Sequence, residues 1–349
     1  MTKQVKIGNV VIGGGNKIAV QSMTNIKTEY INETASQINA LSSAGCDIVR
    51  VAVKYENDAI ALKELKKLTN CPIVADIHFD YRLAIKSIEN GADKIRINPG
   101  NIGSEENIKK VADCLKEYNI PVRVGSNSGS VEKEFLNKYG KNEISLAESA
   151  LKNVYALEKY GIDNIVISAK ASNVPLTYKT YEYLSNKTQY PLHVGVTEAG
   201  TYESGIIKSS VGIGALLLKG IGDTIRVSLT ADPIKEVYAG KKIIRSVGLD
   251  NNYVEVISCP TCGRTEYDSI SLAERVEQLT KDINKPLKIA VMGCVVNGPG
   301  EAKDCDLGIA GSKKTCVIFK KGEVYKQIPF ENAEEEFIKE IKKIAKFVW

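Results

Sequence analysis

Two kinds of short apolar segment alternate along the first two thirds of the chain. One kind follows a glycine and has an aspartate near its start, at positions 45–50, 91–96, 161–166 and 222–226. The other kind opens with proline, at positions 72–78, 121–126 and 191–196, and one further apolar segment, 18–22, precedes them all. Glycine commonly ends a helix, and proline can begin a strand. The alternation therefore predicts eight strands of two types.

Helical patterns separate these strands. In the first helical segment, Ile31, Ala35, Ile38 and Leu41 recur at the spacing of one helix face. The predicted helices span 31–44, 57–69, 80–90, 104–118, 144–160, 177–188, 206–219 and 233–247. Eight strand–helix units in this length of chain are the count and size of a (β/α)8 barrel of the TIM type.

The last hundred residues have a different pattern. Predicted strands at 253–257, 287–292, 307–310 and 315–319 are joined by predicted helices at 270–282 and 331–346. A chain of 349 residues suits two domains. We therefore expect an α/β barrel that binds the substrate at 1–249, followed by a smaller α+β domain at 250–349.

The first residues of the chain predict a short hairpin at 5–20, turned at Gly13-Gly14-Gly15. A glycine-rich loop can also bind phosphate. That use requires a Lys-Ser/Thr pair or a helix start at a fixed spacing, and neither follows here. The glycines therefore favour a turn.

The predicted strands are polar on one face, although parallel strands are usually apolar on both. One set of alternate positions is apolar, as at Val49 and Ile95. The other set carries Gln21, Arg50, Asp76, His78, Arg96, Asn98, Arg123, Asn127, Ser168, Lys170, His193, Thr197, Arg226 and Ser228. Five of these side chains are fixed cations, and both histidines of the protein are among them. We expect this face to line the inside of the barrel.

The inward cations recur in register. Three of them, Arg50, Arg96 and Arg226, lie three residues after a repeat aspartate, whereas Arg123 and His193 lie two residues after a repeat proline. Buried charges without partners are costly, so rings of arginines indicate a bound polyanion, and arginine forks suit phosphate oxygens. The candidate substrate-binding residues are Arg50, Arg96, Arg123, Asn127, Ser168, Lys170, His193, Arg226 and Ser228. Glu198 follows the seventh strand, where barrels build active-site loops, and is a candidate proton donor.

Composition narrows the class of ligand. The net charge is +5, and the last 100 residues hold 15 Lys and Arg against 16 Asp and Glu, so the basic excess lies in the barrel. This favours an anionic ligand over nucleic acid, which requires a basic outer face. No apolar signal region or membrane-length run is present, which predicts a cytoplasmic protein. Four of the eight cysteines lie in apolar segments and are expected to be reduced core thiols: Cys46, Cys71, Cys114 and Cys316.

The other candidate site lies in the second domain. Cys259 and Cys262 have C-x-x-C spacing, Cys294 follows 32 residues later, and Glu301 follows seven residues after that. Three thiolates and one oxygen donor suit a metal cluster with an exchangeable fourth position. A zinc knuckle also begins Cys-Pro-x-Cys-Gly, but it would require a second C-x-x-C pair, which the chain lacks. Cys305 remains an alternative fourth ligand.

Two segments carry a specific resemblance: Ser-Cys-Pro-Thr-Cys-Gly-Arg at 258–264 and Val-Met-Gly-Cys-Val-Val-Asn-Gly-Pro-Gly-Glu at 291–301. They resemble the signatures of the 4-hydroxy-3-methylbut-2-enyl diphosphate synthases of the methylerythritol phosphate route to isoprenoids, and the resemblance covers the whole chain. It implies the compact bacterial type of the family.

The resemblance also implies an activity and a set of functional residues. The activity is reductive ring opening and dehydroxylation of 2-C-methyl-D-erythritol 2,4-cyclodiphosphate, with flavodoxin or ferredoxin as electron donor. A 4Fe-4S cluster would be bound by Cys259, Cys262, Cys294 and Glu301, so that 250–349 is the cluster domain. Glu301 would be catalytic as the exchangeable ligand, and Asn297 and Glu198 would support the ligands or deliver protons.

Topology predicts a dimer. The eighth strand ends at the top of the barrel, and the predicted helix 233–247 carries the chain about 22 Å back toward the bottom before the second domain begins. Because the linker 248–252 is short, we expect the cluster domain to cap the barrel of another subunit in a head-to-tail homodimer. The family is also known for such a dimer.

Two other classes of function fit parts of the pattern. A non-redox barrel lyase for a phosphorylated sugar, with a structural zinc in the second domain, would also use the arginine rings. An RNA-binding barrel with a zinc ribbon is disfavoured, because the basic groups face inward and aromatic stacking platforms are not evident. Zinc in the purified protein would favour either alternative, whereas acid-labile sulfide would exclude both.

Overall fold

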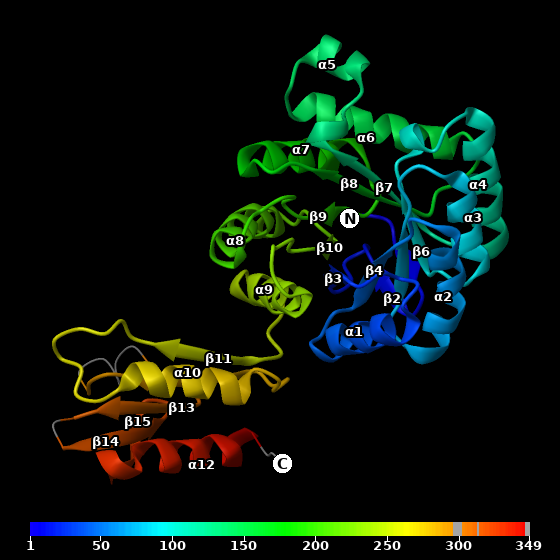
Figure 1. Cartoon of the computed structure of the whole chain (residues 1–349). Coiled ribbons are helices and arrows are strands. Elements are labelled where there is room, and N and C mark those ends of the chain that lie inside the picture. Colours follow the sequence, from blue (N-terminus) through cyan, green and yellow to red (C-terminus); the bar gives the residue numbers. More distant parts are fainter. Residues whose placement is uncertain (296–301, 313, 346–349) are drawn as a thin grey trace. The chain divides into compact units, whose positions relative to one another are not determined.

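The computed structural model describes residues 1–295, 302–312 and 314–345 (Figure 1). The chain forms two compact units, Met1–Leu249 and Asp250–Trp349. The first unit is a barrel and the second a mixed α+β fold, so the predicted fold class is confirmed. The functions predicted for the two units, substrate binding and cluster binding, stay predictions.

Eight parallel strands form the barrel. They are β3 (Ala19–Met23), β4 (Ile48–Ala52), β5 (Ile73–Asp76), β6 (Lys94–Ile97), β7 (Val122–Asn127), β8 (Ile165–Lys170), β9 (His193–Val194) and β10 (Thr224–Ile225). Their order in the sheet is β8-β7-β6-β5-β4-β3-β10-β9. A parallel bridge between Ile167 and Leu192 joins β8 to β9 and closes the ring.

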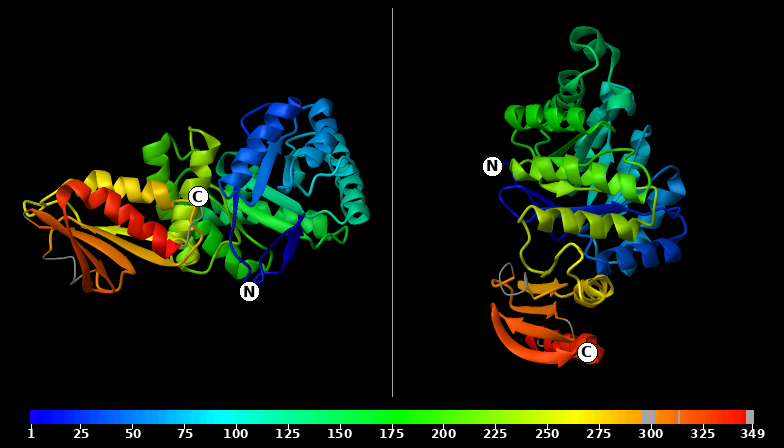
Figure 2. Two further views of the ribbon diagram at one scale, coloured as in Figure 1. Left: turned by 90° about the horizontal axis from the view of Figure 1, so that it is seen from below. Right: turned by 90° about the vertical axis from the view of Figure 1, so that its left-hand side faces the viewer.

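Helices cover the outside of the strands (Figures 1 and 2). They are α1 (Ile31–Ser43), α2 (Glu56–Leu68), α3 (Tyr81–Glu89), α4 (Glu105–Tyr118), α6 (Glu143–Glu158), α7 (Val174–Lys187), α8 (Tyr202–Leu218) and α9 (Pro233–Ser246). Their buried faces pack on outward strand residues such as Val49 and Ile95 to form the main core. An extra helix, α5 (Lys133–Tyr139), follows β7 and has no fully buried residue. The apolar periodicity therefore gave no signal for it.

The predicted N-terminal hairpin is smaller than expected. Its strands β1 (Val5–Ile7) and β2 (Val10–Ile12) pair antiparallel, and the chain turns at Gly8, whose φ is +56°. The turn predicted at Gly13–Gly15 is wrong: these glycines follow β2 and lead toward β3, all with positive φ. The hairpin closes one end of the barrel through a cluster that we call the floor, formed by Val5, Ile7, Ile12, Ala19, Ile48, Val74 and Val166.

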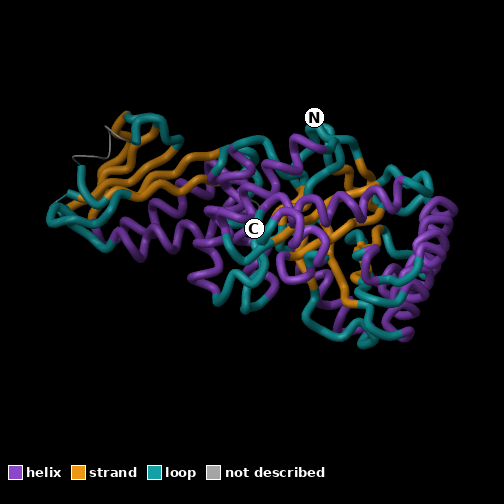
Figure 3. Tube along the Cα trace, turned by 90° about the horizontal axis from the view of Figure 1, so that it is seen from above, coloured by secondary structure: helices purple, strands orange, loops and turns teal. Residues whose placement is uncertain are grey.

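The second unit is a five-stranded sheet with helices on one face (Figure 3). Its strands, in sheet order, are β11 (Val254–Ser258), β12 (Leu287–Met292), β13 (Leu307–Gly311), β14 (Thr315–Lys320) and β15 (Glu323–Pro329). The first three are parallel, and the last two are antiparallel additions. The helices α10 (Ser269–Thr280) and α12 (Ala333–Ala345) pack on the sheet around Phe337 and Val276. The prediction missed β15, which is an edge strand that is mostly exposed.

Two further expectations can be compared with the described residues. No helix among them is both long and apolar enough to cross a membrane. The four cysteines expected in the core are buried free thiols. Burial raises the pKa of Cys71, Cys114 and Cys316 to about 11 in each case, which keeps these thiols protonated at neutral pH.

Replacing Phe337 by Ala should destabilise the second unit. The ring is completely buried between α12 and the sheet, and deletion of such a side chain costs about 3 to 5 kcal/mol in free energy of unfolding. Hydrogen exchange of the β13 amides would measure the loss. Val324→Ala on the exposed edge strand is the matched control and should change the free energy by less than about 0.5 kcal/mol. Equal protection in both variants would contradict this packing.

Candidate functional site

The inward positions of the barrel bring the predicted cations together. Strand register places Asp76 beside Arg96 and Arg96 beside Arg123, on three neighbouring strands. Two glycines make room for the long side chains. A Cβ on Gly125 would lie 2.6 Å from Arg96 Nε, and one on Gly195 would lie 2.8 Å from Lys170 Nζ.

Asp76 is the centre of a group of ion pairs in the barrel. Its carboxylate lies 3.2 Å from Arg96 Nη1 and 3.7 Å from Arg50 Nε. His78 Nε2 lies 3.4 Å from the same carboxylate, but 56% of the His78 side chain is exposed. Burial opposes ionisation of Asp76, yet Arg50, the bond to His78 and Arg96 outweigh it and hold its pKa well below the usual range. Asp76 is therefore a permanent anion that serves several cations.

A second counter-ion, Glu236, comes from outside the strands. Both of its carboxylate oxygens lie 3.3 Å from Arg226, and the Ser22 hydroxyl and the Leu229 N–H also donate to it. Glu236 lies in the first turn of α9 and is buried. Sequence reasoning missed this pair. The sequence feature that could have indicated this pair is a glutamate on the apolar, buried face of α9, one turn before Gly240.

Three inward cations form no ion pair with a carboxylate among the described residues: Lys94, Arg123 and Lys170. Nε and Nη1 of Arg123 have no hydrogen-bond partner there, and neither does Lys94 Nζ. Burial, together with the neighbouring arginines, lowers the pKa of each of the three groups well below its usual value. The prediction from sequence overlooked Lys94.

His193 is completely buried on the inner face of β9. Its Nδ1 lies 2.7 Å from Thr224 Oγ1, whereas Nε2 has no partner within the described structure. The Tyr181 hydroxyl donates to the backbone carbonyl of His193 and so holds this strand in place. Burial, and then Lys170 and Arg123, lower the pKa of His193 well below 6.5. The ring is therefore neutral, with one nitrogen left to serve a ligand.

The remaining barrel candidates lie within strands or just after them. Asn127 ends β7, Ser168 lies inside β8, and Ser228 follows β10. Glu198 follows β9 on an exposed loop, with a left-handed φ of +51°. Non-glycine residues adopt this conformation at a cost, and such strain is concentrated at functional sites. Because Glu198 follows the carboxyl end of β9, it lies at the same end of the barrel as Asn127 and Ser228.

Parallel pairing brings two of the predicted ligands of the second unit together. Ser258 at the end of β11 pairs with Val291 of β12, and the Gly293 N–H donates to Cys259 Sγ over 3.1 Å. Cys259 thus lies against the residue that precedes Cys294. Cys262 is exposed on the turn that leads to Thr265, whose N–H donates to the Cys262 carbonyl.

The donor set fits an iron–sulfur cluster, which is held by thiolates and tuned by N–H groups that donate to sulfur. Within the described ranges, however, no three Cys, His, Asp or Glu side chains form a metal-binding group. Asn297 and Glu301 lie outside the described residues. Cys305 is buried in an apolar cluster with Met292, against which Cys259 packs. Burial raises the pKa of the Cys305 thiol, which disfavours the thiolate that a metal requires.

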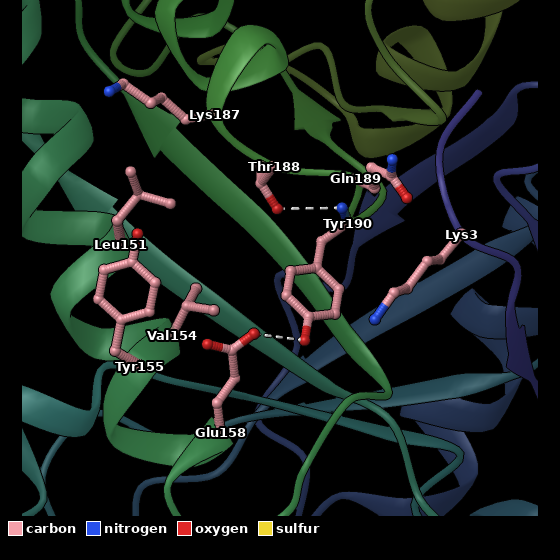
Figure 4. A pocket seen from close by; sticks show the side chains of 9 residues that line it. All are labelled: Lys3, Leu151, Val154, Tyr155, Glu158, Lys187, Thr188, Gln189 and Tyr190. Atoms are coloured by element: carbon pink, nitrogen blue, oxygen red, sulfur yellow. Dashed lines mark hydrogen bonds between the residues drawn. The ribbon is translucent and has the colours of Figure 1, made fainter.

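One pocket of about 200 Å³ lies outside the barrel interior (Figure 4). Its wall includes Tyr190, whose hydroxyl donates to Glu158 over 2.7 Å and whose ring has Lys3 Nζ 4.6 Å from its centre. These residues lie where strands begin, opposite the end that carries barrel active sites. Their polar groups are already paired with one another, so we assign this pocket no function.

The fold and the inward cations define a barrel protein with a strongly basic interior and a separate cysteine-bearing unit. Comparison with known proteins identifies the family. The GcpE TIM-barrel domain family matches residues 2–241, and the GcpE protein C-terminal domain family matches residues 255–343. The chain therefore belongs to the GcpE family, whose curated members are named 4-hydroxy-3-methylbut-2-en-1-yl diphosphate synthase (flavodoxin). The resemblance predicted from the sequence motifs is confirmed.

The similarity to individual relatives extends over the whole chain. The enzyme of Caldanaerobacter subterraneus subsp. tengcongensis is 62% identical over 347 residues, which cover 99% of this chain and 98% of that protein. The enzyme of Clostridium perfringens is 54% identical over 344 residues, which cover 98% of this chain and 99% of that protein. Among solved structures, dihydropteroate synthase from Stenotrophomonas maltophilia aligns with 71% of this chain and 99% of its own at a TM-score of 0.52 and 15% identity. That likeness concerns the barrel fold alone.

The stability of the barrel should depend on pH through His193. Its folded pKa is lowered from 6.5, so the unfolded chain binds the extra proton and stability falls as pH drops below about 6.5. One such group changes the free energy of unfolding by at most about 1.4 kcal/mol per pH unit. In His193→Asn, urea unfolding between pH 6.5 and 5 should show a correspondingly smaller slope of stability against pH. Parallel slopes for the two proteins would contradict a neutral buried His193.

Proposed function

We propose that the protein converts 2-C-methyl-D-erythritol 2,4-cyclodiphosphate to 4-hydroxy-3-methylbut-2-enyl diphosphate, the reaction of its family, with the cyclic diphosphate bound among the barrel cations. The observation that carries the proposal is the surplus of buried positive charge on the inner strand faces. Asp76 and Glu236 compensate part of it, and Arg123 and Lys170 have no carboxylate partner among the described residues. A diphosphate supplies the missing negative charge.

The reaction is a two-electron reduction. Two carbon–oxygen bonds break, one to a phosphate and one to a hydroxyl, and a carbon–carbon double bond forms. Counted for the neutral acids, two electrons and two protons enter and one water leaves. The family consists of iron–sulfur oxidoreductases that carry a 4Fe-4S cluster. A non-redox lyase and an RNA-binding protein are therefore excluded as alternatives.

In this proposal the barrel residues bind and orient the substrate. The guanidinium groups of Arg50, Arg96, Arg123 and Arg226 and the ammonium of Lys170 bind phosphate oxygens. Each charge-assisted hydrogen bond contributes about 1.5 to 3 kcal/mol to binding. Asn127, Ser168 and Ser228 contact the remaining oxygens, and the free Nε2 of His193 binds a hydroxyl. Removal of the diphosphate would leave these cations facing one another.

We propose Cys259, Cys262, Cys294 and Glu301 as the cluster ligands, with Glu301 as the ligand that gives way to substrate. When bound, the cluster would supply the two electrons and a Lewis-acidic iron for the departing oxygen. Glu198 and Asn297 are proposed to deliver protons or support the ligands. The strained backbone of Glu198 supports a functional role at the barrel rim.

We further propose that the enzyme works as a head-to-tail homodimer. The linker from Gly248 to Asn252 is short, and α9 runs back along the barrel before it. The outward face of α8 also exposes Ile207, Val211 and Leu218, which a second copy of the chain would cover. For the electron donor we propose flavodoxin, because the relatives' names specify it.

Metal analysis of variants tests the ligand set. Anaerobically purified wild type should contain about four iron and four sulfide per chain, as a cubane cluster requires. Cys294→Ser should lose most of this content. Glu301→Ala should keep it and lose nearly all turnover of the cyclic diphosphate, because its role is exchange rather than assembly.

The matched control for this experiment is Cys305→Ser. Retained iron, sulfide and turnover would exclude Cys305 as the fourth ligand. Loss of the cluster in Cys305→Ser, with full turnover in Glu301→Ala, would reverse the assignment. About one zinc per wild-type chain without sulfide would contradict the proposal as a whole.

A further inference from the structure

Lys94 is an exception in the floor of the barrel. It is the first residue of β6 and lies one inward position below Arg96 on the same strand. Its register partner on β5 is Val74, a member of the apolar floor. On other strands Ile48 and Val166 also supply apolar floor residues. Lys94 alone among these four brings an amine into this layer, and its side chain is completely buried.

Other inward side chains of the barrel share this lack of partners. Lys94 Nζ has no hydrogen-bond partner in the described structure, and the same is true of Arg123 Nε and Nη1, His193 Nε2 and both amide atoms of Gln21. These side chains project inward from β6, β7, β9 and β3. Buried polar atoms are normally paired, so a group of orphaned donors and acceptors on facing strands indicates an absent ligand.

Packing alone does not account for Lys94. A buried amine without a partner destabilises the folded state, whereas an aliphatic side chain of similar length would fill the same space without that cost. The charged groups that face Lys94 from neighbouring elements are Arg123 on β7 and Arg50 on β4, and His193 on β9 faces it as well. Asp76 is already paired with Arg50 and Arg96. The position therefore gives up stability, which is typical of residues retained for function.

We propose that Lys94 forms the inner end of the anion site, where it binds the innermost phosphate oxygen of the ligand and takes up a proton from solvent as the anion enters. This inference rests on the proposed binding of a diphosphate in the barrel and adds a residue to that site. Gln21 and His193 Nε2 supply neutral hydrogen bonds at the same depth.

The protonation follows from the surroundings of the amine. Burial, and then Arg123 and Arg50, lower the pKa of Lys94 well below its usual value, which disfavours the charged amine in the ligand-free barrel. The unfolded chain therefore holds the proton of Lys94 more tightly than the folded, ligand-free barrel does. The resulting loss of stability grows as pH falls below 10.5. A bound diphosphate places negative charge beside Lys94 Nζ, which favours protonation of the amine.

Calorimetry of the purified holoenzyme with inorganic diphosphate tests the proposal, in two buffers of different ionisation enthalpy. Wild type should bind with net proton uptake. Lys94→Met should bind about tenfold more weakly or worse, because one charge-assisted bond is lost, and should take up close to one proton fewer. Its melting temperature without ligand should rise by several degrees, since the buried amine is removed.

Val74→Met is the matched control, because Val74 is the register partner of Lys94 in the floor. It should leave affinity and proton uptake unchanged. Lys94→Gln provides the same test if Lys94→Met fails to fold. Wild-type affinity and proton uptake in the Lys94 variant would overturn the role of Lys94 and leave the proposed function intact. Absence of diphosphate binding by wild type would instead overturn the anion site itself.

Discussion

The interior of the barrel is dominated by buried positive charge. Six inward basic side chains, from Arg50 on β4 to Arg226 after β10, are accompanied by two buried carboxylates, Asp76 on β5 and Glu236 on α9, in the described part of the barrel. Two charges of the same sign that share a low-dielectric interior repel strongly, and each also loses its hydration. The closed ring of strands, packed outside by a continuous aliphatic core, supplies the stability that keeps these groups together.

The two carboxylates do more than reduce the net charge. Asp76 connects β5 to cations on β4 and β6, and Glu236 connects α9 to Arg226 and to Ser22 of β3. Each carboxylate orients a guanidinium but contacts only some of its N–H groups, so the others can bind a ligand. Arg123, Lys94 and Lys170 remain without carboxylate partners in the described structure, so the site is preorganised for an anion rather than neutralised by the protein. In the proposed function, the acidic substrate is therefore also the missing stabilising partner of these side chains.

Much of this arrangement was predictable from the sequence because the barrel repeats. The glycine–aspartate and proline signals set the register of each strand, and period two then assigned the inward positions of Arg50, Arg96 and Arg226. The predicted helices agree with the structure within a few residues. Local patterns could not identify contacts between distant segments, such as Glu236 with Arg226.

The other differences also have physical reasons. Lys94 was overlooked because it is the first residue of β6, and a lysine at that position is typical of an exposed strand end. The helix α5 and the strand β15 bury few side chains and so carry little hydrophobic periodicity. The hairpin turned at one glycine rather than three because Gly8 already supplies the positive φ that a tight turn requires.

The most direct test of this account is the free energy of unfolding measured against the concentration of 2-C-methyl-D-erythritol 2,4-cyclodiphosphate. If the substrate supplies the missing counter-charge, stability should rise by about 2.7 kcal/mol at a hundred times its dissociation constant. The same sugar without phosphate should have no comparable effect. Equal stability with and without the cyclic diphosphate would contradict the central claim that the buried cations of the barrel exist to bind it.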